Sequence, residues 1–144
     1  MISNRESKKL NTFITIAQQI SELGTCCRLK VGCVLVREDW SVAGMGYNGA
    51  PSGMAHCNPE ICNDNCRCVR TAHAEENAIF YSTGEIFRAF VTHQPCLVCT
   101  KMLARRGVKE IYYLHEYKSM PDHERDFRDT LLAHYNITMC KLSL

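Results

Sequence analysis

The sequence predicts an α/β fold in which a mixed five-stranded central sheet is covered by helices in three layers, α/β/α. Short β-branched apolar runs alternate with stretches of helical periodicity, in the order α-β-β-α-β-α-β-α-β. Strands separated by helices favour a partly parallel sheet, because a helical crossover connects parallel neighbours. The chain of 144 residues shows no repeat, linker or low-complexity stretch, so we expect a single domain over residues 1–144.

The first three elements are a helix and a strand pair. Residues 3–6 read Ser-Asn-Arg-Glu, which has the form of a capping box at a helix start. Apolar residues then recur at helical spacing until Gly24, a plausible stop, which predicts a helix over residues 4–23. The β-branched runs 31–36 and 42–47, with turn-forming residues 37–40 between them, predict a hairpin.

Residues 48–70 have neither helical nor strand periodicity and carry glycine, proline, asparagine and several cysteines. A loop of this length is uncommon in a compact domain unless it is functional or cross-linked. Alternating helices and strands follow, which we predict at residues 72–82 (helix), 86–92 (strand), 96–106 (helix), 110–114 (strand), 121–134 (helix) and 137–142 (strand).

Composition narrows the class of protein. The formal net charge of +2 gives no basic surface for a long nucleic acid. The first residues lack the apolar core of a signal peptide, and no apolar run reaches the roughly 20 residues that span a membrane. We therefore expect no membrane partner and a cytoplasmic location, where disulfides rarely persist. Ten cysteines in such a chain favour metal binding.

Two segments carry candidate catalytic residues: His73-Ala74-Glu75 and Pro95-Cys96-Leu97-Val98-Cys99. Two cysteines three residues apart at a helix start face the same side, and a helix N-terminus stabilises thiolates. His73 also begins a predicted helix, so three ligands can meet at one metal. One imidazole and two thiolates suit a catalytic zinc, which keeps a position for water, whereas a structural zinc normally has four protein ligands.

Glu75 lies two residues after His73, close enough to share the pocket without binding the metal. Such a carboxylate can move protons while an activated water attacks a ring carbon that carries an amino group. The Ala74 and Glu75 backbone groups are expected to face the substrate. A lone Cys-x-x-Cys is often a structural zinc or redox site. The combination with His-x-Glu is the signature of zinc nucleobase deaminases.

These motifs resemble the zinc-dependent cytidine deaminase superfamily. Residues 26–32, 46–53 and 70–75 are similar to deoxycytidylate (dCMP) deaminases of phage and bacterial type, and the likeness extends from about residue 10 to about residue 140. The resemblance implies a cytidine deaminase-like fold and hydrolysis of dCMP to dUMP and ammonia, which supplies dUMP for dTTP synthesis. It also implies a homo-oligomer, usually a hexamer. Regulation would come from dCTP as activator and dTTP as inhibitor, bound with Mg²⁺ at Gly46, Tyr47, Asn48 and Gly49.

The same resemblance implies that Asn48 binds the sugar hydroxyl, although Asn-Gly is also an ordinary turn pair. Ala74 and Thr92 complete the expected substrate site. For the phosphate we favour Arg28 and Tyr117. The other candidates are Lys30, Arg70, Tyr113, His115 and Lys118.

Many relatives carry a second, structural zinc beside the long loop. The candidate ligands are Cys26, Cys57, Cys62, Cys66 and Cys68, and we expect Cys26, Cys57 and two of the other three to bind it. The alternative is a set of reduced thiols. Cys33 and Cys140 follow strand patterns, which predicts that both are buried.

Two competing functions remain at this point. One is a deaminase of the same fold that acts on cytidine, cytosine or an adenosine in RNA. The other is a zinc-stabilised binding module without turnover, which would hold the Cys96 and Cys99 metal with four protein ligands.

Overall fold

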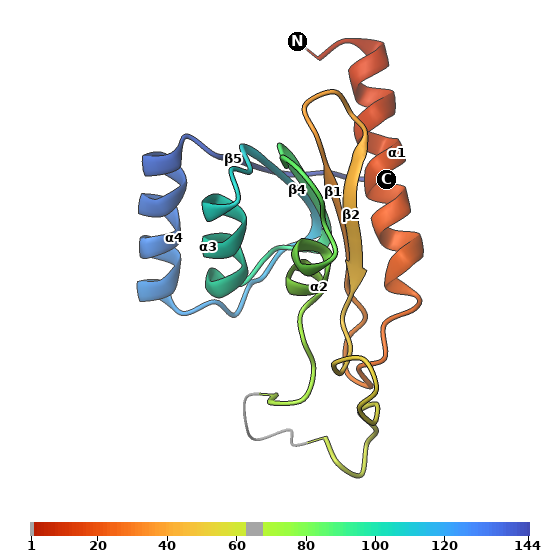
Figure 1. Cartoon of the computed structure of the whole chain (residues 1–144). Helices are drawn as coiled ribbons and strands as arrows, with labels where there is room; N and C mark the ends of the chain where they lie inside the picture. The colour runs from red at the N-terminus through yellow and green to blue at the C-terminus, as the bar shows by residue number, and fades with distance from the viewer. Residues whose placement is uncertain (1, 63–67) are drawn as a thin grey trace.

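The computed structural model describes residues 2–62 and 68–144, and within them five strands form one mixed sheet in the order β2-β1-β3-β4-β5 (Figure 1). The strands are β1 (Gly32–Val36), β2 (Val42–Tyr47), β3 (Arg88–His93), β4 (Glu110–His115) and β5 (Thr138–Lys141). The helices are α1 (Asn4–Ser21), α2 (Ala74–Phe80), α3 (Leu97–Arg105) and α4 (Asp122–Tyr135). The predicted fold class and element order are confirmed.

The helices cover both faces of the sheet (Figure 1). Helix α1 packs on one face, where Ile14 lies in a buried cluster with Val34 and Phe90. Helices α2 and α3 cover the other face, where Ala78 and Leu103 pack against the strands. Helix α4 lies beside α3, and its Leu131 and Leu132 pack against the same core. Alternate residues of a strand face opposite sides of the sheet. Since helices cover both sides, every residue of β1 is buried, and the strand reads as a continuous apolar run.

The sheet topology brings several element ends to one edge. Strand β1 is antiparallel to β2 and β3, whereas β3, β4 and β5 are parallel. The start of β1 and the end of β2 therefore lie beside the ends of β3 and β4. In open α/β sheets, ligands bind outside the carboxyl ends of the parallel strands. We therefore expect the functional site at this edge.

A close contact between β2 and α2 positions the start of α2. A Cβ added at Gly46 would lie 2.6 Å from the Ala74 carbonyl oxygen, so only glycine allows this approach. The helix start that carries His73 and Glu75 is thus held directly against the sheet.

Two sequence expectations about cysteines have different outcomes. Cys33 is fully buried between β1 and the α2 layer, as predicted. Cys140 is exposed, so the prediction of burial was wrong. It lies on the edge strand β5, and α1 covers β1 and β3 without reaching that far. Among the described residues, no helix combines the length and apolar character that crossing a membrane requires.

Candidate active site

A cavity of about 690 Å³ opens at the predicted edge of the sheet. Its volume lies in the range typical of small-molecule sites. The lining comes from the segment before β1, the long loop, the start of α2, the turn after β3 and the loop after β4. The residues that line it include Arg28, Asn48, Cys57, Cys62, His73, Ala74, Glu75, His93, Gln94, Cys96, Tyr117 and Lys118.

His73, Cys96 and Cys99 form one group in which all ligand atoms lie within 4.8 Å of one another. His73 Nδ1 is 3.3 Å from Cys99 Sγ and 3.6 Å from Cys96 Sγ. Tetrahedral zinc with ordinary Zn–N and Zn–S bond lengths would separate such ligand atoms by about 3.6 Å. The group therefore fits a zinc ion, and among the described residues it contains no fourth side-chain ligand.

Two helix N-termini hold these ligands in place. His73 is the N-cap of α2, Cys96 is the N-cap of α3, and Cys99 lies in the first turn of α3. The Cys99 N–H donates to Cys96 Sγ at 3.5 Å. Unpaired N–H groups at a helix start favour a thiolate, which is one reason this position suits a metal ligand.

The charges of the group also suit a cation. Hydrogen bonding from Cys99, together with the nearby His73, lowers the pKa of Cys96 to about 4. The hydrogen bond to Cys96 raises the pKa of His73 to about 9. The Cys96 thiolate that attracts a proton to His73 would equally attract a divalent cation, which would displace that proton.

Glu75 lies beside the group and is only 4% exposed, and its burial raises the pKa of the carboxyl to about 7. Its neighbour Glu76 has a different place, because Glu76 Oε1 accepts the His73 N–H at 3.0 Å and so caps α2. Of the two adjacent carboxylates, Glu75 is therefore the one that faces the cavity.

Asn48 lines the cavity and also holds the segment before β1. Its Oδ1 accepts the Val31 N–H at 2.8 Å, and its Nδ2 donates to the Leu29 carbonyl at 2.7 Å. A Cβ at Gly24 would lie 2.6 Å from Asn48 Oδ1, so glycine there makes room for the amide. An amide can make further hydrogen bonds, so a ligand contact remains compatible with this role.

The other predicted substrate residues differ in position. Ala74, Arg28 and Tyr117 line the cavity. Thr92 lies behind the wall, where its Oγ1 accepts the Gly32 N–H at 3.1 Å and contacts His93 Nδ1 at 2.9 Å. Of the other phosphate candidates, Lys118 lines the cavity, whereas Lys30, Arg70, Tyr113 and His115 do not.

Comparison with known proteins assigns this arrangement to a family. Residues 7–115 match the model of the cytidine and deoxycytidylate deaminase zinc-binding region, which covers His73, Glu75, Cys96 and Cys99. The chain belongs to this family. The family membership inferred from the sequence motifs is thereby confirmed.

The relatives include a bacterial protein, a phage protein and a solved phage structure. ComE operon protein 2 of Bacillus subtilis (strain 168) is 38% identical over 76% of this chain and 60% of its own length. The deoxycytidylate deaminase of Mycobacterium phage D29 is 34% identical over 72% of this chain and 92% of its own length. The dCMP deaminase of cyanophage S-TIM5, in complex with dCMP and dUMP, superposes with a TM-score of 0.78 and 28% identity. That match covers 99% of this chain and 100% of the cyanophage chain.

The loop predicted to bind effectors lies between two cavities. Asn48 faces the large cavity, whereas Gly46, Tyr47 and Gly49 line a second cavity of about 360 Å³. Gly49 and Ala72 exchange two backbone hydrogen bonds, of 3.1 and 2.8 Å. Because Ala72 precedes His73, this loop is linked directly to the group of His73, Cys96 and Cys99.

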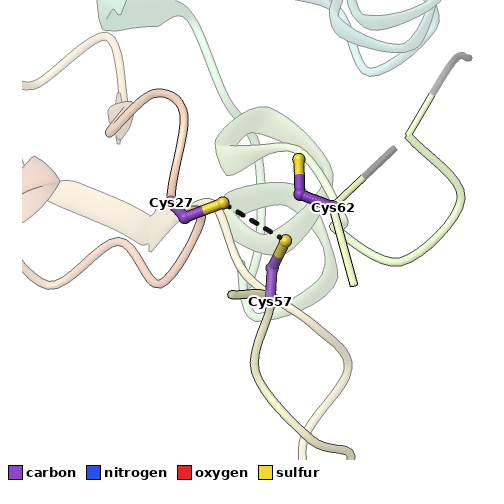
Figure 2. A group of neighbouring side chains, drawn as sticks. All are labelled: Cys27, Cys57 and Cys62. Atoms are coloured by element: carbon purple, nitrogen blue, oxygen red, sulfur yellow. Dashed lines mark hydrogen bonds between the residues drawn. The ribbon is translucent and has the colours of Figure 1, made fainter. Parts of the chain in front are cut away.

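A second group of three cysteines lies near the cavity wall (Figure 2). The Sγ atoms of Cys27, Cys57 and Cys62 are within 4.8 Å of one another, and those of Cys27 and Cys57 are 3.6 Å apart. Partial desolvation of the exposed Cys27 by its neighbours, together with hydrogen bonds to the Cys57 and Cys62 thiols, raises the pKa of Cys27 to about 12. A bound cation would reverse that effect by stabilising thiolates.

Sequence reasoning missed Cys27 in this group. The three Sγ atoms that lie within 4.8 Å of one another include neither Cys26 nor Cys68. Cys26 Sγ accepts the Arg28 N–H at 3.4 Å, and Cys68 Sγ accepts the Thr71 N–H at 3.4 Å. Cys66 lies outside the described residues. The adjacent pair Cys26-Cys27 was the only available signal, and a pair of neighbours does not reveal which of the two points towards the loop.

Proposed function

We propose that this chain catalyses the hydrolytic deamination of dCMP to dUMP and ammonia. The observation that carries the proposal is the three-ligand group of His73, Cys96 and Cys99 beside the buried Glu75, in a cavity of about 690 Å³. The choice of dCMP is supported by the cyanophage enzyme, whose matched structure holds dCMP and dUMP.

His73, Cys96 and Cys99 would hold a zinc ion. Zinc, when bound, acidifies a water molecule and so supplies a nucleophile near neutral pH. Glu75 takes one proton from the attacking water and gives it to the ring nitrogen of the cytosine. It then carries the second proton, from the hydroxyl added to the ring carbon, to the amino group, so that the C–N bond breaks and ammonia leaves. Burial of Glu75 suits this work, because a carboxyl shielded from bulk water exchanges its proton with the substrate.

The substrate would lie with its base at the metal group and its phosphate towards the cavity rim. In this arrangement the Ala74 backbone faces the base, Asn48 binds the sugar hydroxyl, and Arg28 and Tyr117 bind the phosphate. The support is that all four residues line the same cavity. Thr92 would act from behind the wall, by holding the start of β1.

We further propose that dCTP activates and dTTP inhibits the enzyme at Gly46, Tyr47, Asn48 and Gly49, with Mg²⁺ neutralising part of the triphosphate charge. The second cavity and the Gly49–Ala72 backbone pair support this, because they connect an effector position with His73. Turnover measured with each effector, with and without Mg²⁺, tests the proposal. Unchanged rates would contradict it.

The chain is proposed to work in the cytoplasm as one domain of residues 1–144, where its product dUMP would be used for dTTP synthesis. The domain is also proposed to assemble into a homohexamer. The support for assembly is a set of exposed apolar side chains on the edge strand β2 and on the end of α2: Val42, Met45, Phe80 and Tyr81. Sedimentation velocity should show a hexamer, and a monomer at micromolar concentration would contradict this proposal.

A second, structural zinc is proposed at Cys27, Cys57 and Cys62. Two thiolates on one tetrahedral zinc would be about 3.8 Å apart, close to the 3.6 Å between Cys27 and Cys57 Sγ. A structural zinc has four ligands, so one further group would complete it. Plasma mass spectrometry should find two zinc ions per chain, and a single ion would contradict this site.

The substrate is tested by an ammonia-release assay across dCMP, CMP, deoxycytidine, cytosine and an adenosine-containing RNA. We expect dCMP to give the highest kcat/KM. A preference for an unphosphorylated substrate or for RNA would indicate another deaminase of this fold. No turnover of any substrate by zinc-loaded protein would favour the binding-module alternative.

A further inference from the structure

Gln94 is a buried polar side chain to which the proposed mechanism gives no role. It follows the last residue of β3 and precedes Pro95 and the metal ligand Cys96. The residue is 8% exposed and lines the large cavity. A buried amide is retained at such a place only when its hydrogen bonds are satisfied, so its partners indicate what it does.

The partners of Gln94 come from the two elements that follow β3 in the sheet. Its backbone N–H donates to the His115 carbonyl at 2.8 Å, at the end of β4. Its Oε1 accepts the Tyr117 N–H at 3.0 Å, and its Nε2 donates to Met139 Sδ in β5 at 3.3 Å. The side chain therefore ties the turn that carries Cys96 to the loop after β4.

This tie acts where the regular sheet has ended. The pairing of β3 with β4 finishes at His93 and His115, so the Tyr117 N–H is held by a side chain instead of a strand partner. The loop of residues 116–119 that this bond holds supplies one wall of the cavity. Tyr117 and the cationic Lys118 are in that wall, together with the acidic Glu116.

We infer that Gln94 is a positioning residue for nucleotide specificity, which sets the distance between the phosphate-facing loop 116–119 and the metal-bearing turn. The inference rests on the proposed function and deepens it. A nucleotide has a fixed length between its reacting ring and its phosphate. Because the loop is hydrogen-bonded to Gln94, two residues before Cys96, the distance between the phosphate end and the metal end of the site matches the length of the nucleotide.

The chemistry of the amide suits this role. Oε1 must accept an N–H, whereas Nε2 meets a thioether, which accepts hydrogen bonds weakly and cannot donate. A glutamate would bury a charge against that sulfur. Methionine has nearly the same length and volume as glutamine and lacks the acceptor, so Gln94→Met removes the tie with little change in packing.

The test compares two substrates in two variants. In Gln94→Met we expect the KM for dCMP to rise about tenfold, as for one lost hydrogen bond, with kcat changed less than about twofold. The kcat/KM for deoxycytidine, which has no phosphate, should also change less than about twofold. The matched control Met139→Leu removes only the weak sulfur partner and should leave the KM for dCMP within about twofold.

An unchanged KM for dCMP in Gln94→Met, or an equal loss with dCMP and deoxycytidine, would overturn the inference, because a purely structural residue affects both substrates alike. If that variant does not fold, amide hydrogen exchange of the wild-type protein tests whether the loop 116–119 responds to the phosphate. Exchange at residues 116–119 should slow by about tenfold with dUMP and not with deoxyuridine, and equal protection by both would refute the positioning role. Failure of the proposed function is distinguishable, since wild-type protein would then not prefer dCMP.

Discussion

The molecule gathers cysteines at two places, and the two groups are built differently. His73, Cys96 and Cys99 are positioned by the first residues of two helices that pack on the sheet. Cys27, Cys57 and Cys62 come from segments outside the helices and strands, and Cys27 is exposed. Regular elements with their own buried contacts position ligands without a metal, whereas a loop cluster gains much of its order from the ion that it binds. The first group suits catalysis and the second suits cross-linking of the loop.

The largest effect on catalysis is expected beside His73, Cys96 and Cys99, which we call the helix-borne group. Glu75→Gln keeps the size and hydrogen-bonding capacity of the side chain but cannot move protons, so kcat should fall by about 10³-fold. Zinc content and melting temperature should stay close to wild type, because Glu75 is not a ligand in the proposed site. Ammonia release and plasma mass spectrometry measure the two properties. Full activity would remove Glu75 from the mechanism.

A smaller effect is expected where the sheet supports that group. Gly46→Ala places a Cβ 2.6 Å from the Ala74 carbonyl oxygen, which forces α2 away from β2. We expect a loss of about 2 kcal/mol in unfolding free energy, with kcat reduced as well because His73 and Glu75 move with α2. Denaturant unfolding measures the loss. The control Ser52→Ala, at an exposed loop position, should cost less than about 0.5 kcal/mol.

The smallest effect on catalysis is expected at Cys27, Cys57 and Cys62, the loop-borne group. The two neighbouring cysteines Cys26 and Cys27 give a matched pair of variants. Cys27→Ser should reduce the zinc content from two ions per chain to one and speed proteolysis of residues 48–62 by about tenfold. Cys26→Ser should keep both ions, because Cys26 Sγ is not one of the three Sγ atoms that lie within 4.8 Å of one another. The opposite result would assign the ligand role to Cys26, as expected from the resemblance alone.

Local sequence signals were sufficient to predict that the three residues of the helix-borne group lie together. A histidine and a cysteine at helix N-caps, with their partners one turn away or less, have their directions set within a few residues of chain. The strands were recognisable for a similar reason, since their apolar runs are continuous in sequence. The family was recognisable because the same short motifs carry the chemistry.

The remaining features depend on contacts between residues distant in sequence, so only the tertiary structure decided them. Cys27, and not its neighbour Cys26, has its Sγ within 4.8 Å of those of Cys57 and Cys62. Cys140 is exposed because α1 covers the strands in the middle of the sheet and not the edge strand β5. The bond between Gln94 and Tyr117 joins two loops whose separation is set by strand pairing. Spacing along the chain was enough to predict that His73, Cys96 and Cys99 lie together. Packing across the sheet determined which other side chains meet, because side-chain direction outside regular elements follows from long-range contacts.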